Sequence, residues 1–243
     1  MKRNIKLVIE YDGTDFVGWQ RQPNGRSVQE EIENAVLKIT QEQIQLTGAG
    51  RTDSGVHARG QVANYFTSSS ISEKEIHRAL NGVLPEDVVV HSVENVDEQF
   101  SARHSAKERE YQYFISKINS AIDRKFCWQI GYTLDIAKMN EIASSILGIH
   151  DFQSFSKTDT EVDHFRSQIF ESVWYEKEDK IIYRIRANRF LYGMVRALVG
   201  TMVNIGRGFT HVNEFQEIII SKNRSKAGQA APAKGLFFER VIY

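Results

Sequence analysis

The segment Gly48-Ala-Gly-Arg-Thr-Asp-Ser-Gly-Val-His-Ala-Arg-Gly60 carries the residue types best suited to chemistry. Its four glycines predict a backbone conformation that most residues resist, and it presents Asp53, His57 and two arginines, one of them Arg51. A carboxylate on such a loop could act as a nucleophile or a base. A tight surface turn, in which Asp53 only accepts hydrogen bonds from nearby amides, explains the same residues. For His57, a hydrogen bond within the loop is favoured over proton transfer.

The surrounding sequence excludes two common kinds of ligand site. The phosphate-loop pattern Gly-x-x-x-x-Gly-Lys-Ser/Thr is absent, and no lysine occurs between Lys38 and Lys74. Asp53 has no acidic neighbour in its segment, and the seven histidines are scattered without the close pairs that zinc hydrolases need. The single cysteine, Cys127, leaves too few thiolates for a cysteine-rich zinc site. We therefore expect no metal site.

A second candidate cluster is Ala102-Arg-His-Ser-Ala-Lys-Glu-Arg-Glu-Tyr-Gln-Tyr113, in which basic residues such as Arg103 precede a strand-like run. On a strand, Tyr111 and Tyr113 share one face, so an aromatic surface would stand beside cations. That combination suits an unstacked nucleotide base. Packing in the core explains the tyrosines equally well, and for Tyr113 we favour the core.

A third cluster lies in the apolar run that ends Phe190-Leu-Tyr-Gly-Met-Val-Arg196-Ala-Leu-Val-Gly200. A helix this apolar is buried over most of its surface, and Arg196 sits within it. Because an unpaired buried charge is very costly, the guanidinium needs an anion. Carboxylates are the strongest internal candidates, and Asp53 is the one we select.

The elements that must position these residues follow from hydrophobic periodicity. Ser27-Val-Gln-Glu30 and Ser72-Glu-Lys-Glu75 have the capping-box pattern and precede apolar residues at helical spacing. Further helices are expected from Asp135 to a stop at Gly148 and from Phe190 to Ile205. Strands are expected at residues 5–11, 61–66, 88–96, 110–116, 167–175, 181–187 and 236–242.

This order predicts an α/β (α+β) protein made of two similar halves with mainly antiparallel sheets, residues 1–105 and 106–243. The first half carries the Asp53 loop, and the second carries Tyr111 and Arg196. The join is not marked by a low-complexity linker.

Composition limits the partners and the compartment. With 31 basic and 31 acidic residues, any nucleic-acid binding must use a local patch. The lone cysteine excludes an intrachain disulfide framework and favours a reducing, cytoplasmic setting. The run from Met1 leads directly into a strand-like segment, so we expect neither a signal peptide nor a membrane span.

Together these segments resemble the TruA-type family of tRNA pseudouridine synthases. Gly-Arg-Thr-Asp-Ser-Gly-Val-His-Ala is similar to the family signature Gly-Arg-Thr-Asp-Ala-Gly-Val-His around the catalytic aspartate. The likeness continues, in the same order, through Tyr11-Asp-Gly-Thr-x-Phe-x-Gly-Trp-Gln20, Phe100-x-Ala-Arg-x-Ser-Ala106 with Tyr111, Phe190-Leu-Tyr-x-Met-Val-Arg196 and Ala231-Pro-Ala-x-Gly-Leu236. Departures are small: Ser54 stands where alanine is usual, and Gln229-Ala230 replaces a more typical hydroxyl residue.

The resemblance implies a pseudouridine synthase fold with the active-site cleft between the halves, a homodimer, and no metal or organic cofactor. The implied substrate is the anticodon stem-loop of tRNA, where uridines at positions 38, 39 and 40 become pseudouridine.

The resemblance also implies roles for individual residues. Asp53 would act as the catalytic carboxylate, either adding covalently or taking a ribose C2′ proton. Arg196 would keep it ionised. Tyr111 would stack on the flipped uracil and help to remove the C5 proton, and Leu236 would pack on the base. Arg51 and Arg103 would bind phosphates, or Arg51 would fill the space left by the flipped base. A salt bridge within the loop is the alternative for Arg51.

Two other functions stay open from the residues alone. A noncatalytic RNA-binding protein, such as a tRNA folding factor, would use the same basic patch without forming product. A nucleoside glycosidase would release free uracil, whereas a synthase releases nothing.

Overall fold

The computed structural model describes residues 2–158 and 162–243; Met1, where the predicted first half begins, lies outside these ranges. The chain divides into two compact units. The first comprises the residues up to Lys107 together with Phe237–Tyr243, and the second comprises Glu108–Leu236. The sequence-based division instead placed the boundary after residue 105 and assigned Phe237–Tyr243 to the second half. These seven residues belong to the first unit because they pair with one of its strands.

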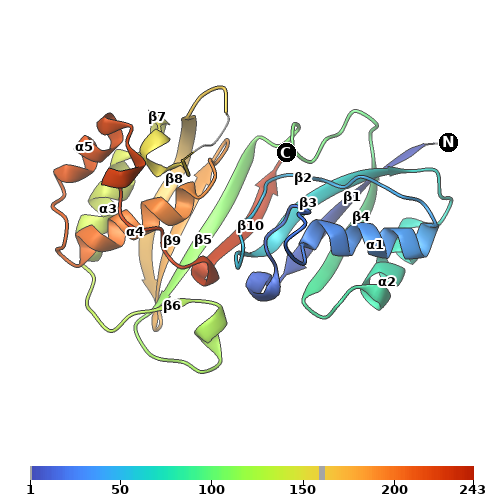
Figure 1. Cartoon of the computed structure of the whole chain (residues 1–243), viewed down its shortest axis with the longest axis horizontal. Helices are drawn as coiled ribbons and strands as arrows, with labels where there is room; N and C mark the ends of the chain where they lie inside the picture. The colour runs from blue at the N-terminus through green and yellow to red at the C-terminus, as the bar shows by residue number, and fades with distance from the viewer. Residues whose placement is uncertain (1, 159–161) are drawn as a thin grey trace. The chain divides into compact units, whose positions relative to one another are not determined.

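The first unit is built on a sheet whose strand order is β4-β1-β3-β10 (Figure 1). The β1 pairings with β3 and β4 are antiparallel, whereas β10 runs parallel to β3. Alternation along β1 buries Ile5, Leu7 and Ile9 completely, as expected for a strand with one face in the core. The elements are β1 (Arg3–Tyr11), α1 (Val28–Thr40), the short β2 (Thr47–Gly48), β3 (His57–Thr67), α2 (Glu73–Val83), β4 (Val88–Val96) and β10 (Leu236–Ile242).

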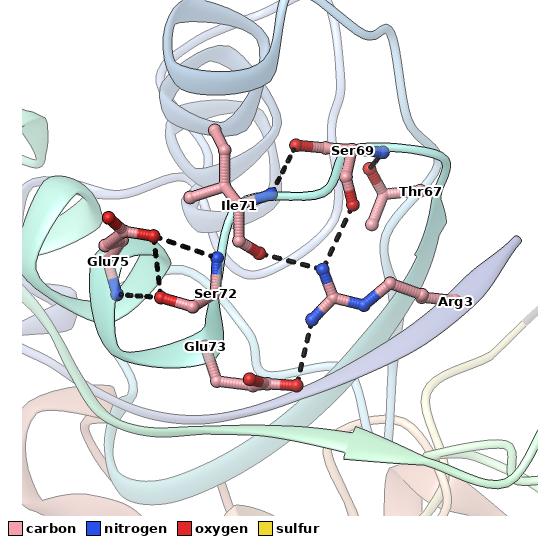
Figure 2. Close-up of polar contacts among 7 residues, drawn as sticks. All are labelled: Arg3, Thr67, Ser69, Ile71, Ser72, Glu73 and Glu75. Atoms are coloured by element: carbon pink, nitrogen blue, oxygen red, sulfur yellow. Dashed lines mark hydrogen bonds and ion pairs between the residues drawn. The ribbon is translucent and has the colours of Figure 1, made fainter. Parts of the chain in front are cut away.

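The N-terminus of α2 has the predicted capping box. The Ser72 hydroxyl accepts from Glu75 N at 3.4 Å, and the Glu75 carboxylate accepts from Ser72 N at 3.1 Å. Arg3, at the start of β1, donates to the carbonyl of Ile71 at 2.8 Å and pairs with Glu73 at 2.9 Å (Figure 2). Strand and helix are thereby joined at the turn that starts α2.

The capping box predicted for α1 is only half formed. The Ser27 hydroxyl accepts from Glu30 N at 3.4 Å, as predicted. The Glu30 carboxylate instead lies 3.4 Å from Arg21 Nε, and among the described residues no bond from it to Ser27 N is present. A nearby cation therefore competes successfully for the carboxylate.

The second unit is built on an antiparallel sheet with the strand order β5-β9-β8-β7. Helix α3 packs against β8 and against α4, which is buried along most of its length. The elements are β5 (Glu108–Ser116), the short β6 (Trp128–Gln129), α3 (Ile136–Ser145), β7 (Gly148–Asp151), β8 (Arg166–Lys177), β9 (Lys180–Ala187), α4 (Met194–Gly206) and α5 (Glu214–Ser221).

Two helix boundaries differ from the sequence-based expectation. Helix α4 begins at Met194 rather than at Phe190, because Gly193 before it has a left-handed φ of 74°. Helix α3 ends at Ser145, and Gly148, with φ of 92°, opens β7 instead of stopping the helix. The predicted fold class, α/β with mainly antiparallel sheets, is confirmed. Within residues 2–158 and 162–243, no helix is long and apolar enough to cross a membrane.

Candidate functional site

The Asp53 loop is fixed by backbone hydrogen bonds to the segment that follows β1. The carbonyl of Thr52 accepts from Trp19 N at 3.1 Å, and Asp53 forms an isolated β-bridge with Gly18. The carbonyl of Asp53 accepts from Val56 N at 3.1 Å, which closes a tight turn. Asp53 itself is half-buried. Its backbone is therefore held on both sides.

Two glycines outside the loop allow this close approach. Gly18 has a φ of 123°, and a Cβ there would lie 2.7 Å from the carbonyl oxygen of Thr52. A Cβ on Gly13 would lie 2.0 Å from the carbonyl oxygen of Val56. Both separations are below the 3.0 Å that real Cβ atoms respect, so any side chain would push the loop away.

Buried side chains also form hydrogen bonds with the Asp53 loop. The Tyr11 hydroxyl lies 2.7 Å from the Thr52 hydroxyl, and Gln61 Nε2 donates to the carbonyl of Gly50 at 2.8 Å. Burial raises the pKa of Tyr11 far above its ordinary value, so the phenol keeps its proton. The residues on either side of Arg51 are thus anchored, while the Arg51 side chain is exposed.

His57 has the structural role that its sequence context favours. Its ring is 1% exposed and stacks on Phe237 with centroids 4.7 Å apart. Nδ1 lies 3.0 Å from Gly13 N and 3.1 Å from the carboxylate of Asp12. An amide can only donate, so we assign Nδ1 as the acceptor from Gly13 rather than as a cation paired with Asp12. His57 therefore joins β3 to the turn that follows β1.

Arg103 projects from a short turn attached to the sheet of the first unit. Ala102 N donates to Asn64 Oδ1 at 2.8 Å, and the carbonyl of Ala102 accepts from the Tyr243 hydroxyl at 2.9 Å. The Arg103 side chain is exposed. Within the first unit, the cationic side chains of Arg51 and Arg103 therefore extend from backbone whose neighbouring residues are held by hydrogen bonds.

In the second unit, Tyr111 and Tyr113 lie on one face of β5, as predicted. Tyr111 is 7% exposed and contacts Phe190 edge-on, with ring centroids 5.0 Å apart. Tyr113 is completely buried, which confirms its assignment to the core. Phe190 thus orients the ring that was expected to stack on a base, a contact that the sequence did not reveal.

Arg196, on the first turn of α4, is joined twice to Ala231. Its Nε donates to the carbonyl of Ala231 at 2.8 Å, and Ala231 N donates to the carbonyl of Arg196 at 2.9 Å. The acceptor of Nε within this unit is thus a carbonyl oxygen, and the carboxylate partner that the sequence predicts for this guanidinium stays a prediction. Leu236, five residues after Ala231, is 5% exposed.

The order of these motifs along the chain agrees with one known family. A family profile described as tRNA pseudouridine synthase matches residues 7–105 and 142–243. The chain belongs to this family.

Curated members of the tRNA pseudouridine synthase family match along their whole length. The tRNA pseudouridine synthase A of Thermoanaerobacter sp. (strain X514) is 42% identical over 243 residues, covering 99% of this chain and 100% of the relative. The enzymes of the same name from Acetivibrio thermocellus and Pelodictyon phaeoclathratiforme are 43% and 44% identical, with the same coverage.

Five of the six candidate residues lie within the ranges that the family profile matches: Arg51, Asp53, Arg103, Arg196 and Leu236. Tyr111 lies between the two matched ranges. Within the described residues, no group of three or more His, Cys, Asp or Glu side chains could hold a metal ion.

Proposed function

We propose that this protein isomerises uridine to pseudouridine in tRNA, at positions 38, 39 and 40 of the anticodon stem-loop. The observation that carries the proposal is the anchored loop that presents half-buried Asp53 within the family signature. Such a loop holds its carboxylate at a defined position, which a catalytic group requires and a general RNA-binding surface does not.

The reaction needs no atoms beyond those of the substrate. The bond between ribose C1′ and uracil N1 breaks, the base turns, and C5 bonds to C1′. The C5 proton leaves, and N1 ends with a proton. Asp53 starts this sequence either by forming a covalent adduct or by taking the C2′ proton.

The other candidate residues serve the same nucleotide. The role proposed for Arg196 is to favour the ionised form of Asp53, because a cation stabilises the charged form of a carboxylate. Tyr111 stacks on the flipped uracil and assists removal of the C5 proton. Leu236 packs on the freed base, while the exposed cations Arg51 and Arg103 bind phosphates of the RNA. The proposal therefore requires both units to act on one substrate.

The proposal also includes a homodimeric state and a cytoplasmic location. The dimer is suggested by the resemblance to the TruA-type family, and its test is the molar mass in solution. The cytoplasmic setting is supported by the single cysteine and by tRNA as the substrate.

The deciding experiment incubates the pure protein with an unmodified tRNA transcript, maps every pseudouridine and measures free uracil. Wild type is compared with Asp53→Asn, which keeps the shape of the side chain and removes its charge. Asp15→Asn is the matched control, because Asp15 is an exposed carboxylate of the same unit with no assigned role. We expect product from wild type and Asp15→Asn, and none from Asp53→Asn, which should still fold and bind tRNA.

Three other results would redirect the proposal. Binding of tRNA without product would favour a noncatalytic RNA-binding protein. Release of uracil would indicate a glycosidase. Near-normal turnover by Asp53→Asn would show that another group carries the chemistry.

A further inference from the structure

The hydroxyl of Tyr113 has a specific partner that core packing alone does not require. Tyr113 is completely buried on β5, and its hydroxyl donates to the carbonyl of Pro232 at 2.8 Å. Burial raises the pKa of Tyr113 well above the ordinary value, so the phenol keeps the proton that it donates. The bond joins β5 to a segment more than a hundred residues later in the chain.

The same ring sets the turn that leads to Leu236. Residues Ala233–Gly235 form a single 3-10 turn after Pro232. A Cβ on Gly235 would lie 2.6 Å from Cζ of Tyr113, so the backbone passes directly over the phenol. The turn is thereby held at both ends, by the hydroxyl at Pro232 and by the ring at Gly235. Leu236 is the next residue.

On the N-terminal side of this turn, Pro232 follows Ala231. Ala231 hydrogen-bonds both to the side chain and to the backbone carbonyl of Arg196. Gly200, one helical turn after Arg196, allows this approach, because a Cβ there would lie 1.8 Å from the carbonyl oxygen of Gln229. The segment from Gln229 to Leu236 is therefore fixed between α4 and the ring of Tyr113.

We infer that Tyr113 is a positioning residue for the proposed isomerisation: it fixes the 231–236 segment and, through it, both Arg196 and Leu236. This inference rests on the proposed function, since its consequence is measured on pseudouridine formation. Tyr113 does not touch the substrate. It acts by holding the Arg196 guanidinium and the Leu236 side chain in one arrangement, and small displacements of such groups are costly for rate.

The sheet supplies a matched comparison. Tyr183 on β9 lies directly opposite Tyr113 in the register of the two strands and is also completely buried. Its hydroxyl bonds to the Ser172 hydroxyl at 2.8 Å, within the sheet and not at the 231–236 segment. Tyr113 and Tyr183 occupy paired positions on neighbouring strands. Replacing either one by phenylalanine removes one buried, hydrogen-bonded hydroxyl group.

The test compares Tyr113→Phe with Tyr183→Phe in full-length protein. Thermal unfolding, tRNA affinity and the single-turnover rate of pseudouridine formation are measured for each. We expect both variants to lose stability to a similar extent. Only Tyr113→Phe should slow the single turnover, by about 10- to 100-fold, with tRNA affinity within about threefold of wild type. Equal rates for the two variants would overturn the inference, as would a Tyr113→Phe defect confined to affinity.

Gly235→Ala tests the same link from the other side, because its methyl group would push against the Tyr113 ring. The same signature is expected: a slowed single turnover with retained binding. A wild-type rate for Gly235→Ala would also overturn the inference. If wild type itself forms no pseudouridine, the proposed function fails; if wild type is active and the variants match it, only the role of Tyr113 fails.

Discussion

Substituting Gly13 by alanine would test whether the backbone next to Asp53 must stay where it is. The new Cβ would lie 2.0 Å from the carbonyl oxygen of Val56 and 2.5 Å from its carbon. Ordinary van der Waals contact begins at 3.4 Å, so the two segments must separate by roughly 1.4 Å. Both opposing atoms belong to the backbone, so no side-chain rotation can relieve the clash.

The displacement would reach the Asp53 loop directly. Val56 N donates to the carbonyl of Asp53, and Gly13 N donates to His57, so both ends of the turn would shift. Overpacking of this kind costs about 1–3 kcal/mol of folding free energy. For a chain of this size, that corresponds to a melting temperature lower by about 2–12 °C. A misplacement of about 1 Å at a catalytic group costs on the order of 10²-fold in rate.

The assay measures thermal unfolding and single-turnover pseudouridine formation at 25 °C, where the variant remains folded. Gly82→Ala is the control, because Gly82 lies in helix α2 of the same unit and has no atom within 4 Å of an added Cβ. Alanine there should stabilise the helix by about 0.5–1 kcal/mol and leave the rate unchanged. If Gly13→Ala keeps both the wild-type rate and the wild-type melting temperature, the close approach has no bearing on the site.

Three further outcomes are expected. Tyr111→Ala should weaken retention of the flipped base by about 1–3 kcal/mol. Tyr111→Phe should keep tRNA capture but lose about 10²–10⁴-fold in product if its hydroxyl helps to remove the C5 proton. Both variants are compared by tRNA affinity and single-turnover kinetics, and wild-type values for Tyr111→Ala would assign the ring to the core. Replacing Arg51 and Arg103 together by glutamine should reduce the slope of log affinity against log salt by roughly two units, about one per lost phosphate contact; an unchanged slope would place the RNA elsewhere. Activity should persist in excess EDTA with tRNA folded without divalent ions, and a loss restored specifically by zinc would reveal a metal requirement.

The sequence predicted best where local chemistry alone decides the structure. Ser72 and Glu75 form their capping box because both partners lie within one helical turn. The alternation of Ile5, Leu7 and Ile9 places β1 correctly, because side chains on a strand point to opposite faces in turn.

Contacts between distant segments were beyond this kind of reasoning. The half-formed cap at Ser27 reflects Arg21, which lies outside the four-residue capping pattern and approaches Glu30 from the loop before the helix. The carboxylate partner expected for Arg196 stays a prediction, and within the second unit its Nε donates to the carbonyl of Ala231. A backbone acceptor has no side-chain signature, so no residue type could have predicted it. Gly13 is a further example that the sequence alone could not predict. Glycine is required there because a Cβ would clash with Val56, and this contact is known only from the structure.

The position of strand β10 in the chain determines when the Asp53 loop can be completed during synthesis. This strand pairs with β3 at His57 and Ala58, immediately after the Asp53 loop, and Glu239 forms an ion pair with Arg59 at 2.7 Å. Yet β10 follows the whole second unit in the chain. At about 5–20 residues per second, a ribosome needs on the order of ten seconds to make that unit. During this time β3 lacks the strand that pairs with it beside the Asp53 loop. Nascent chains should therefore acquire a finished Asp53 loop only after translation has passed β10.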